Sequence, residues 1–260
     1  MKINELKLVY FSPTGTTRRV IMETARHIGL KSVSFDFSVY KAKKPVLKFT
    51  ENDFALFAAP VYGGRVPALF TEYLENITGK GTPAALIVTY GCREYEDALL
   101  EMKTVVESHG FKVIAAAAFP AEHSIIQTIG ARRPNKEDMK TIGEFGVEIN
   151  RRIKNEKSFD QIQIQVPGNS PYRKYSTIPL TPKTDSTRCT ECGSCARVCP
   201  AGAISLKDPK KTDSKKCISC MKCIRVCKEY ARSISSLKLR MTENKLKKVC
   251  QSDKKADIFL

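Results

Sequence analysis

The chain has 260 residues, of which 42% are apolar, and its formal net charge is +17 at pH 7. This length suits one domain of ordinary size together with one small domain. No run of 18 apolar residues occurs, so we expect no membrane span. The N-terminus enters an apolar run without a basic stretch or a cleavage site, so we expect a cytoplasmic protein.

Apolar runs alternate with segments of helical period over roughly the first 150 residues. Strands are expected at residues 6–11, 33–37, 54–59, 84–89 and 111–119, and helices at 16–28, 67–76, 95–109 and 136–153. Continuous apolar strands that alternate with helices are typical of a parallel sheet covered on both faces. The pattern predicts an α/β fold with a doubly wound, five-stranded parallel sheet in the flavodoxin-like order.

The chain is expected to divide into four parts. Residues 1–156 carry the α/β pattern, and residues 157–182 form a proline-containing linker that packs on the first domain. Residues 183–238 are dense in cysteine and predict a small domain that is not held by a large apolar core. Residues 239–260 form a basic tail, which we expect to be a solvated helix or disordered.

One cysteine pattern occurs twice in the third part, at an offset of 28 residues. The first copy is Cys189, Cys192, Cys195 and Cys199, and the second is Cys217, Cys220, Cys223 and Cys227. Three thiolates at intervals of three can bind three corners of one [4Fe–4S] cube, while the fourth cysteine is carried to the other cube. We therefore expect one cluster on Cys189, Cys192, Cys195 and Cys227, and another on Cys217, Cys220, Cys223 and Cys199.

Two other interpretations of the cysteines are weaker. Structural zinc sites rarely use three cysteines in a C-x2-C-x2-C run. Disulfides need an oxidising compartment, which the expected cytoplasmic location does not provide.

A hydroxyl-rich loop follows the first expected strand and opens the first expected helix. Its residues are Ser12, Pro13, Thr14, Gly15, Thr16 and Thr17. Free N–H groups and the dipole at a helix start favour an anion, and the hydroxyls can donate to phosphate oxygens. Neither a dinucleotide fingerprint nor a P-loop is present. The loop is therefore a candidate site for the phosphate of FMN.

Two further loops are expected at the same edge of the sheet and are candidates for the flavin ring. They contain Pro60, Val61, Tyr62, Gly63 and Gly64, and Thr89, Tyr90, Gly91, Cys92, Arg93 and Tyr95. Glycine lets the backbone approach a flat ring edge, and Tyr62 or Tyr95 could cover the face of the ring. Loop packing remains the alternative role of each tyrosine.

The cysteine repeat resembles bacterial-type two-cluster ferredoxins, and the three loops resemble those of a flavodoxin. Residues 3–235 together resemble the fused flavodoxin–ferredoxin proteins of anaerobic bacteria, sometimes called ferrodoxins. This resemblance implies FMN, two [4Fe–4S] clusters and electron transfer, and it implies a small α+β two-cluster ferredoxin domain for residues 183–238. One departure is Lys228, which stands where such ferredoxins carry proline after the last cysteine.

The charge is uneven, with 19 basic and 8 acidic residues from Lys183 onward. No RNA or DNA motif accompanies it, and we expect no nucleic-acid partner. The basic surface can instead guide acidic electron-carrier proteins such as a ferredoxin or flavodoxin, or a redox enzyme, with plain solubility as the alternative. The oligomeric state is open, with a homodimer as one option.

Other residues have weaker claims. His123 follows the fifth expected strand and is a candidate proton donor, although a structural role in the turn is the favoured interpretation. Cys92 is expected to be merely small and Cys250 to have no role, while Asn135 is a candidate helix N-cap.

These features predict an electron-transfer protein that relays electrons between its clusters and FMN, and so couples one-electron carriers to a one- or two-electron partner. The alternative is a flavin-dependent reductase of a small acceptor, such as a quinone or nitro compound. A redox sensor that binds nucleic acid is disfavoured. Whether the chain is an enzyme is open, and the donor, acceptor and potentials do not follow from the sequence.

Overall fold

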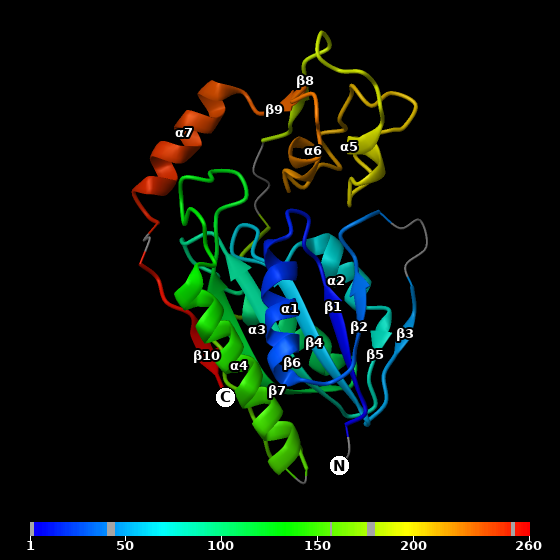
Figure 1. Ribbon diagram of the computed structural model, residues 1–260, viewed down its shortest axis with the longest axis vertical. Coiled ribbons are helices and arrows are strands. Elements are labelled where there is room, and N and C mark those ends of the chain that lie inside the picture. The colour runs from blue at the N-terminus through cyan, green and yellow to red at the C-terminus, as the bar shows by residue number, and fades with distance from the viewer. Residues whose placement is uncertain (1–2, 41–44, 157, 176–179, 251–252) are drawn as a thin grey trace.

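The computed structural model describes residues 3–40, 45–156, 158–175, 180–250 and 253–260, and its central feature is a twisted sheet with helices on both faces (Figure 1). Five strands lie parallel in the order β2-β1-β4-β6-β7. They are β1 (Glu5–Tyr10), β2 (Ser32–Asp36), β4 (Asp53–Pro60), β6 (Thr82–Tyr90) and β7 (Phe111–Pro120). This confirms the predicted flavodoxin-like order of five strands.

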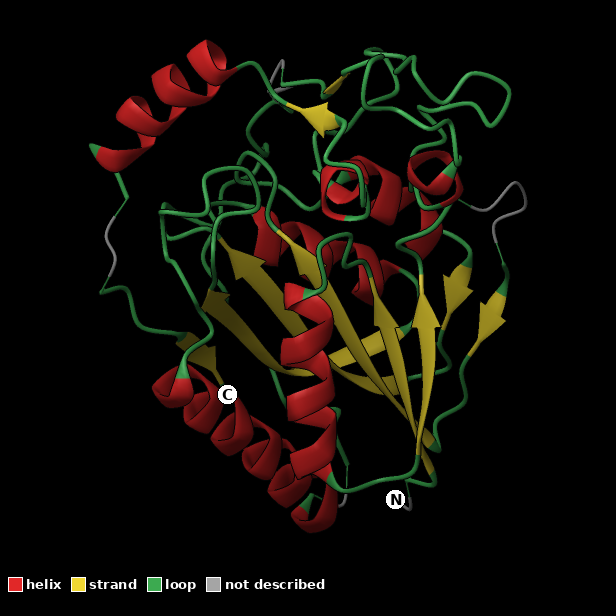
Figure 2. Ribbon diagram, turned by 45° about the horizontal axis from the view of Figure 1, so that its top comes forward, coloured by secondary structure: helices red, strands yellow, loops and turns green. Residues whose placement is uncertain are grey.

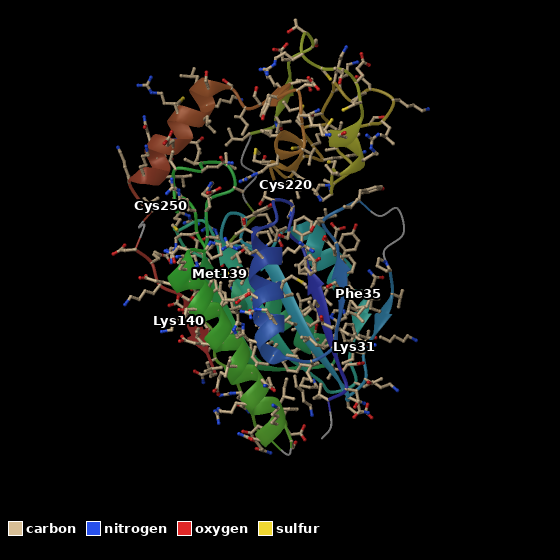
Figure 3. The ribbon with its side chains drawn as sticks, viewed as in Figure 1. Lys31, Phe35, Met139, Lys140, Cys220 and Cys250 are labelled. Atoms are coloured by element: carbon tan, nitrogen blue, oxygen red, sulfur yellow. The ribbon has the colours of Figure 1, made fainter. Side chains whose placement is uncertain are left out.

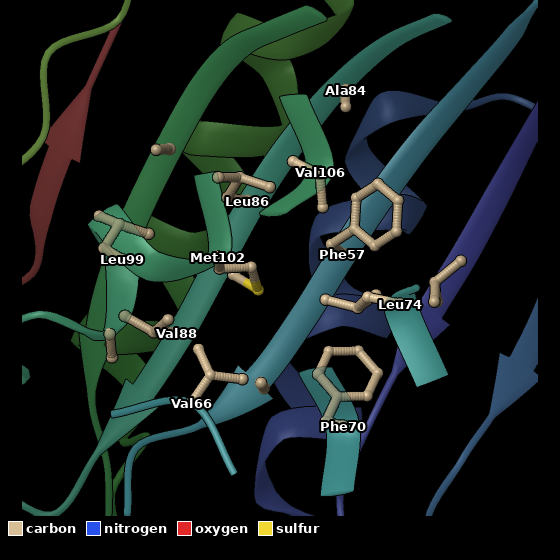
Figure 4. Packing of buried hydrophobic residues seen from close by; sticks show 14 of the residues in the cluster. Phe57, Val66, Phe70, Leu74, Ala84, Leu86, Val88, Leu99, Met102 and Val106 are labelled. Carbon is tan, nitrogen blue, oxygen red and sulfur yellow. The ribbon is translucent and has the colours of Figure 1, made fainter. Parts of the chain in front are cut away.

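Helices cover both faces of this sheet, as expected when the strands β4, β6 and β7 are buried along nearly their whole length (Figure 2). On one face lie α1 (Thr16–Ile28) and α4 (Lys136–Asn155), which pack against each other. On the other lie α2 (Ala68–Leu74) and α3 (Ala98–Ser108). Figure 4 shows the core on this second face, where Phe70 and Leu74 of α2 and Met102 of α3 pack over Phe57 and Leu86 of the sheet.

Helix boundaries agree with the sequence pattern where local signals are strong. Helix α4 begins after Asn135, whose side chain accepts from the Asp138 N–H at 3.0 Å while Asp138 accepts from the Asn135 N–H at 2.8 Å. This reciprocal capping box confirms Asn135 as the N-cap. Between α2 and the sheet edge, the short strands β3 (Leu47–Lys48) and β5 (Ile77–Thr78) form a small separate pair that was not predicted.

The C-terminal tail is more ordered than expected. Helix α7 (Ser236–Lys247) lies beside the loops that follow β7, and β10 (Asp257–Phe259) joins the main sheet antiparallel to β7. The expectation of a solvated helix or a disordered tail is therefore wrong for β10, which makes the sheet six-stranded. A three-residue strand carries too little periodicity to be recognised, and its partner lies far away in sequence.

The cysteine-rich part lies over the carboxyl ends of the parallel strands (Figure 1). It contains the strand pair β8 (Lys183–Thr184) and β9 (Arg232–Ser233) and the short helices α5 (Ser194–Arg197) and α6 (Lys222–Arg225). Its small buried cluster includes Cys199, Cys223, Ala203 and Ile204. This is a small α+β domain, as the ferredoxin resemblance implies, with cysteines in place of much of a core.

The segment after α4 was expected to be a linker that packs on the first domain, although residues 157 and 176–179 of it lie outside the described residues. Ile164 is buried in the core on the α2/α3 face, with Ile162 and Val166 against it. Further along, Asp97 accepts from the backbone N–H of Asn169 at 2.8 Å and of Arg173 at 2.7 Å. The described part of this segment is thus bound to the α/β domain. In the described ranges, no helix combines the length and apolarity needed to cross a bilayer.

Candidate functional site

A cavity of about 280 Å³ lies at the carboxyl edge of the sheet, where the three predicted loops meet. Residues from each loop line it: Thr14, Thr16, Thr17, Pro60, Val61, Tyr62, Gly63, Thr89, Tyr90 and Gly91. Loops after neighbouring parallel strands converge at one edge, so this grouping follows from the strand order. The remaining predicted loop residues lie outside the lining: Ser12, Pro13, Gly15, Gly64, Cys92, Arg93 and Tyr95.

The first loop contains a glycine turn at the start of α1. Gly15 has a φ of 91° at the N-cap of α1, a left-handed conformation that only glycine adopts without strain. A Cβ built on Gly15 would meet nothing within 4 Å, so the space beside it is open. The Ser12 hydroxyl is already used, because it accepts from the Arg18 N–H at 2.8 Å. Of the first-turn N–H groups of α1, that of Arg18 is therefore taken, while those of Thr16 and Thr17 have no partner among the described residues and remain suited to an anion.

The two tyrosines that were expected to cover a ring differ in position. Tyr62 borders the cavity, and burial, together with the nearby Cys220 sulfur, raises the pKa of its hydroxyl well above the usual value. Tyr95 instead packs against Tyr90, with ring centroids 5.3 Å apart, and bonds to Asp257 of β10. The strand that takes up Tyr95 could not be foreseen from the loop sequence.

His123 also lines the cavity and is held in one orientation. Its Nδ1 accepts from the N–H groups of Ile125 at 3.2 Å and Ile126 at 3.1 Å. Burial, with a contribution from the Arg93 cation, lowers its pKa to about 4. The ring is therefore neutral at pH 7 with its proton on Nε2, so it can donate a hydrogen bond but is not a cationic acid.

A fourth wall of the cavity was not predicted. It comprises Lys215, Lys216, Cys217, Ile218 and Ser219 of the cysteine-rich part, together with Tyr175 of the linker. The Tyr175 hydroxyl donates to Glu101 at 2.8 Å, and the Arg65 guanidinium lies 4.2 Å from its ring centroid. Sequence spacing held no signal for this wall, because it depends on how the two parts of the chain pack together.

Four of the eight cysteines surround a second, smaller cavity: Cys199, Cys217, Cys220 and Cys223. They are the set that crossed ligation predicts, three from the second repeat and one from the first. Burial raises the pKa of Cys220 to about 12 and that of Cys223 to about 11. Both side chains therefore stay protonated at pH 7 until a metal that binds the sulfur displaces the proton. Cys220 lies on the side of this domain that faces the sheet (Figure 3).

Among the described residues, no three His, Cys, Asp or Glu side chains stand close enough to share one metal ion. That finding is compatible with a four-iron cluster, in which each thiolate binds a different iron and the sulfurs stand further apart.

The two repeats fold into the same local structure, 28 residues apart. Helices α5 and α6 occupy equivalent positions, and Glu191 and Ser219 both have left-handed φ values, of 56° and 53°. Hydrogen bonds from backbone N–H groups also repeat. The Ala203 N–H donates to Cys199 Sγ and the Ala231 N–H to Cys227 Sγ, both at 3.3 Å. The Asp185 N–H donates to the Ala231 carbonyl oxygen at 2.7 Å and the Asp213 N–H to the Ala203 carbonyl oxygen at 2.8 Å. The offset maps the four cysteines of the small cavity onto Cys189, Cys192, Cys195 and Cys227.

The four repeat cysteines outside the small cavity are less buried than the four that surround it. Cys192 is exposed, and Cys189, Cys195 and Cys227 are half-buried, whereas Cys199, Cys220 and Cys223 are buried. We therefore call Cys199, Cys217, Cys220 and Cys223 the inner set, because Cys217 also lines the larger cavity, and the other four the outer set.

The two remaining cysteines lie near one another but away from both sets. Cys92 is fully buried and its thiol points to the Ala121 carbonyl oxygen at 3.6 Å, which agrees with its expected role as a small side chain. Cys250 follows α7 and lies 3.9 Å from the Gly91 carbonyl oxygen.

Comparison with known proteins identifies the cysteine-rich part. Residues 188–232 match the family model described as a 4Fe-4S dicluster domain. No curated protein matches the chain significantly.

Several solved structures resemble the α/β part. A flavodoxin from the domain Archaea is 14% identical over 58% of this chain and 99% of its own, with a TM-score of 0.43. A Fusobacterium nucleatum flavodoxin bound to flavin mononucleotide is 19% identical over 58% and 99%, with a TM-score of 0.41. The rubredoxin:oxygen oxidoreductase of Desulfovibrio gigas is 14% identical over 59% of this chain and only 37% of its own, with a TM-score of 0.43.

The fold assignment depends on the strand order and the parallel pairing, not on these similarities, which are low. The family match covers the segment that holds both cysteine repeats. The chain thus joins an α/β domain of flavodoxin-like fold to a segment that matches a 4Fe-4S dicluster domain.

Proposed function

We propose that this protein is an electron-transfer iron–sulfur flavoprotein that carries FMN and two [4Fe–4S] clusters. FMN can exchange one or two electrons and each cluster exchanges one, so together they couple one-electron carriers to a one- or two-electron partner. The main support for this proposal is that residues 217–219 form a wall of the large cavity, while Cys217 also belongs to the inner set. The two sites therefore share a wall.

The large cavity fits FMN in its chemistry. The Gly15 turn and the start of α1 offer backbone N–H groups for a phosphate, and the Thr14, Thr16 and Thr17 hydroxyls lie at the same end. Most of the remaining lining is apolar or backbone, which suits a flat ring that is held by a few polar contacts. Three tyrosines border the cavity. Tyr62 and Tyr90 come from the predicted loops, and Tyr175 comes from the linker.

The inner and outer sets fit two clusters. The inner set surrounds a cavity, and the 28-residue equivalence supports the same role for the outer set. The Ala203 and Ala231 N–H groups donate to Cys199 and Cys227, and hydrogen bonds to ligand sulfurs raise the reduction potential of a cluster. Arg232, buried between the repeats, also donates to Cys195 Sγ at 3.5 Å.

The direct test is anaerobic reconstitution followed by iron, sulfide and flavin analysis and a spectroscopic redox titration. We expect about eight irons and one FMN per chain. The Cys220→Ala variant should lose the inner cluster, whereas Cys250→Ala, which changes a cysteine outside both sets, should keep full iron content. A wild-type protein with no flavin, or one that keeps its iron in the Cys220→Ala variant, would contradict the proposal.

A second candidate, a flavin-dependent reductase of a small acceptor such as a quinone or nitro compound, is favoured by one observation. The large cavity also has polar walls outside the three loops, from Glu122, Ser124, Lys215 and Lys216. Stopped-flow mixing of the reduced protein with such compounds separates the two functions. Saturable oxidation that falls in a Lys216→Ala variant would support a reductase, and slow non-saturable oxidation would support a carrier. A cytoplasmic location and an acidic protein partner remain predictions.

A further inference from the structure

The second cysteine repeat is covered by the α/β domain. Lys222 of α6 donates to the Ser38 carbonyl oxygen at 2.8 Å, and Arg225 of α6 pairs with Glu122 at 3.4 Å. The loop before α6 lines the large cavity. One face of the repeat, made of α6 and the loop before it, is thus used to dock the inner set against the proposed flavin site.

The first repeat presents the equivalent face to solvent. A shift of 28 residues relates Lys222 to Ser194, Arg225 to Arg197, and the loop of Cys217 to the loop of Cys189. Arg197 is exposed, and its guanidinium donates to the Cys192 carbonyl oxygen at 2.7 Å. Arg225 pairs with Glu122 of the α/β domain, but among the residues that the structure describes none from that domain forms a hydrogen bond or ion pair with Arg197.

The exposed face also carries the side chains of a protein interface. A Cβ built on Gly193, beside Cys192, would lie 3.0 Å from Arg197 Nη1 and 3.2 Å from Leu206 Cδ2, so these two side chains flank the outer set. Leu206 is 62% exposed. Lys207 and Lys211 are exposed on the same loop. An apolar contact with a cationic rim suits an acidic protein surface.

The charge of the whole domain agrees with this choice. Residues 183–238 contain 13 basic and 5 acidic residues. Lys222 and Arg225 of the second repeat are engaged at the domain interface, whereas Lys207 and Lys211 of the first repeat are exposed.

We propose that the face formed by Cys192, Arg197, Leu206, Lys207 and Lys211, which we call the α5 face, is the docking surface for a small acidic one-electron carrier protein. The proposal rests on the proposed function. On docking, the reduced carrier loses one electron and this chain gains it, and no bond forms or breaks. Electron tunnelling weakens steeply with distance, so the exposed Cys192 marks the place where a protein partner approaches the outer set most closely. A carboxylate of the carrier takes the position opposite Arg197 that Glu122 takes opposite Arg225.

The test uses the reconstituted protein and a reduced, acidic [2Fe–2S] ferredoxin as the probe in stopped-flow mixing. Lys207→Glu/Lys211→Glu reverses two charges on the α5 face, and Lys140→Glu/Lys154→Glu makes the same change on exposed residues of α4. We expect the second-order rate constant to fall about tenfold or more for the first variant only, and the difference to disappear at high salt. Arg197→Gln should show a smaller loss with unchanged iron content. Reduction by dithionite, which needs no docking, should stay at the wild-type rate.

Equal rate constants for the two double variants would overturn the proposal. So would a wild-type dimer, seen by analytical ultracentrifugation, that Lys207→Glu/Lys211→Glu converts to a monomer, because the α5 face would then bind a second copy of the chain. Failure of the proposed function has a different signature, since dithionite would then give no flavin or cluster bleaching in the wild type.

Discussion

Glu101 is the centre of a buried network that fixes the linker to the α/β domain, and its removal offers a quantitative test. The carboxylate is 3% exposed and accepts from Arg65 Nε and Nη2, both at 2.7 Å, from Val66 N–H at 3.0 Å and from the Tyr175 hydroxyl at 2.8 Å. The Glu101→Ala variant leaves the Arg65 cation buried without its counter-ion. Breaking such a pair from one side costs about 3–5 kcal/mol.

At about 2–4 °C per kcal/mol for a domain of this size, this loss lowers the apparent melting temperature by roughly 6–20 °C. The measurement is a thermal melt at fixed scan rate, read by circular dichroism. Lys103→Ala, which removes a surface pair with Glu107 on the same helix, is the matched control and should cost about 0.3–0.5 kcal/mol. Because Tyr175 loses its anchor, FMN affinity should fall in Glu101→Ala and not in Lys103→Ala.

The reasoning would be refuted if Glu101→Ala melted no lower than Lys103→Ala. An Arg65→Met/Glu101→Leu double variant checks the cause. It removes both charges together, so it should recover much of the stability that Glu101→Ala loses. It should not recover the FMN affinity, since Tyr175 still lacks its hydrogen-bond partner.

Three further predictions concern the cavity and the sheet edge. Gly15→Ala and Gly29→Ala impose the same left-handed strain at opposite ends of α1, where neither Cβ meets an atom within 4 Å, so both should cost about 1–2 kcal/mol, but only Gly15→Ala should weaken FMN binding in a fluorescence titration. His123 stays neutral in the folded protein until about pH 4, while in the unfolded chain it takes up its proton near pH 6.5. As the pH falls from 7 to 5, this difference lowers the free energy of unfolding by about 2 kcal/mol. The melting temperature of His123→Gln should therefore decrease less between pH 7 and pH 5 than that of the wild type or of His109→Gln. Deletion of residues 253–260 should accelerate amide exchange on β7 around Ala116 to Ala118, which pair with β10, and leave the exchange of β1 unchanged.

The sequence was most informative where structure depends on local signals. Four of the five parallel strands contain apolar runs, and the capping box at Asn135 lies within four residues. The cysteine repeat predicted that Cys199 groups with Cys217, Cys220 and Cys223, and these four surround the smaller cavity. In each case the interaction or the repeat pattern lies within a short stretch of chain.

The expectations that depended on distant segments were less accurate. Tyr95 follows the strand expected to bring it to the proposed flavin site, but it lies outside the cavity, where it contacts Asp257 of β10 and the ring of Tyr90. Tyr175 and the Cys217–Ser219 wall reach the cavity only because the linker and the second repeat pack on the α/β domain. No periodicity in the sequence encodes such packing between domains.

The return of the chain to β7 through β10 changes what kind of attachment the iron–sulfur domain has. It enters from the linker, which Asp97 and Glu101 hold, and it leaves through α7 into the main sheet. It is therefore an insertion closed at both ends, not an appendage on one tether. Two attachments reduce the volume that the domain can explore when it undocks, so its effective concentration at the cavity is higher than a single linker would give. Transfer between the two parts should then be first-order and independent of protein concentration, even when single docking contacts such as Arg225–Glu122 are removed.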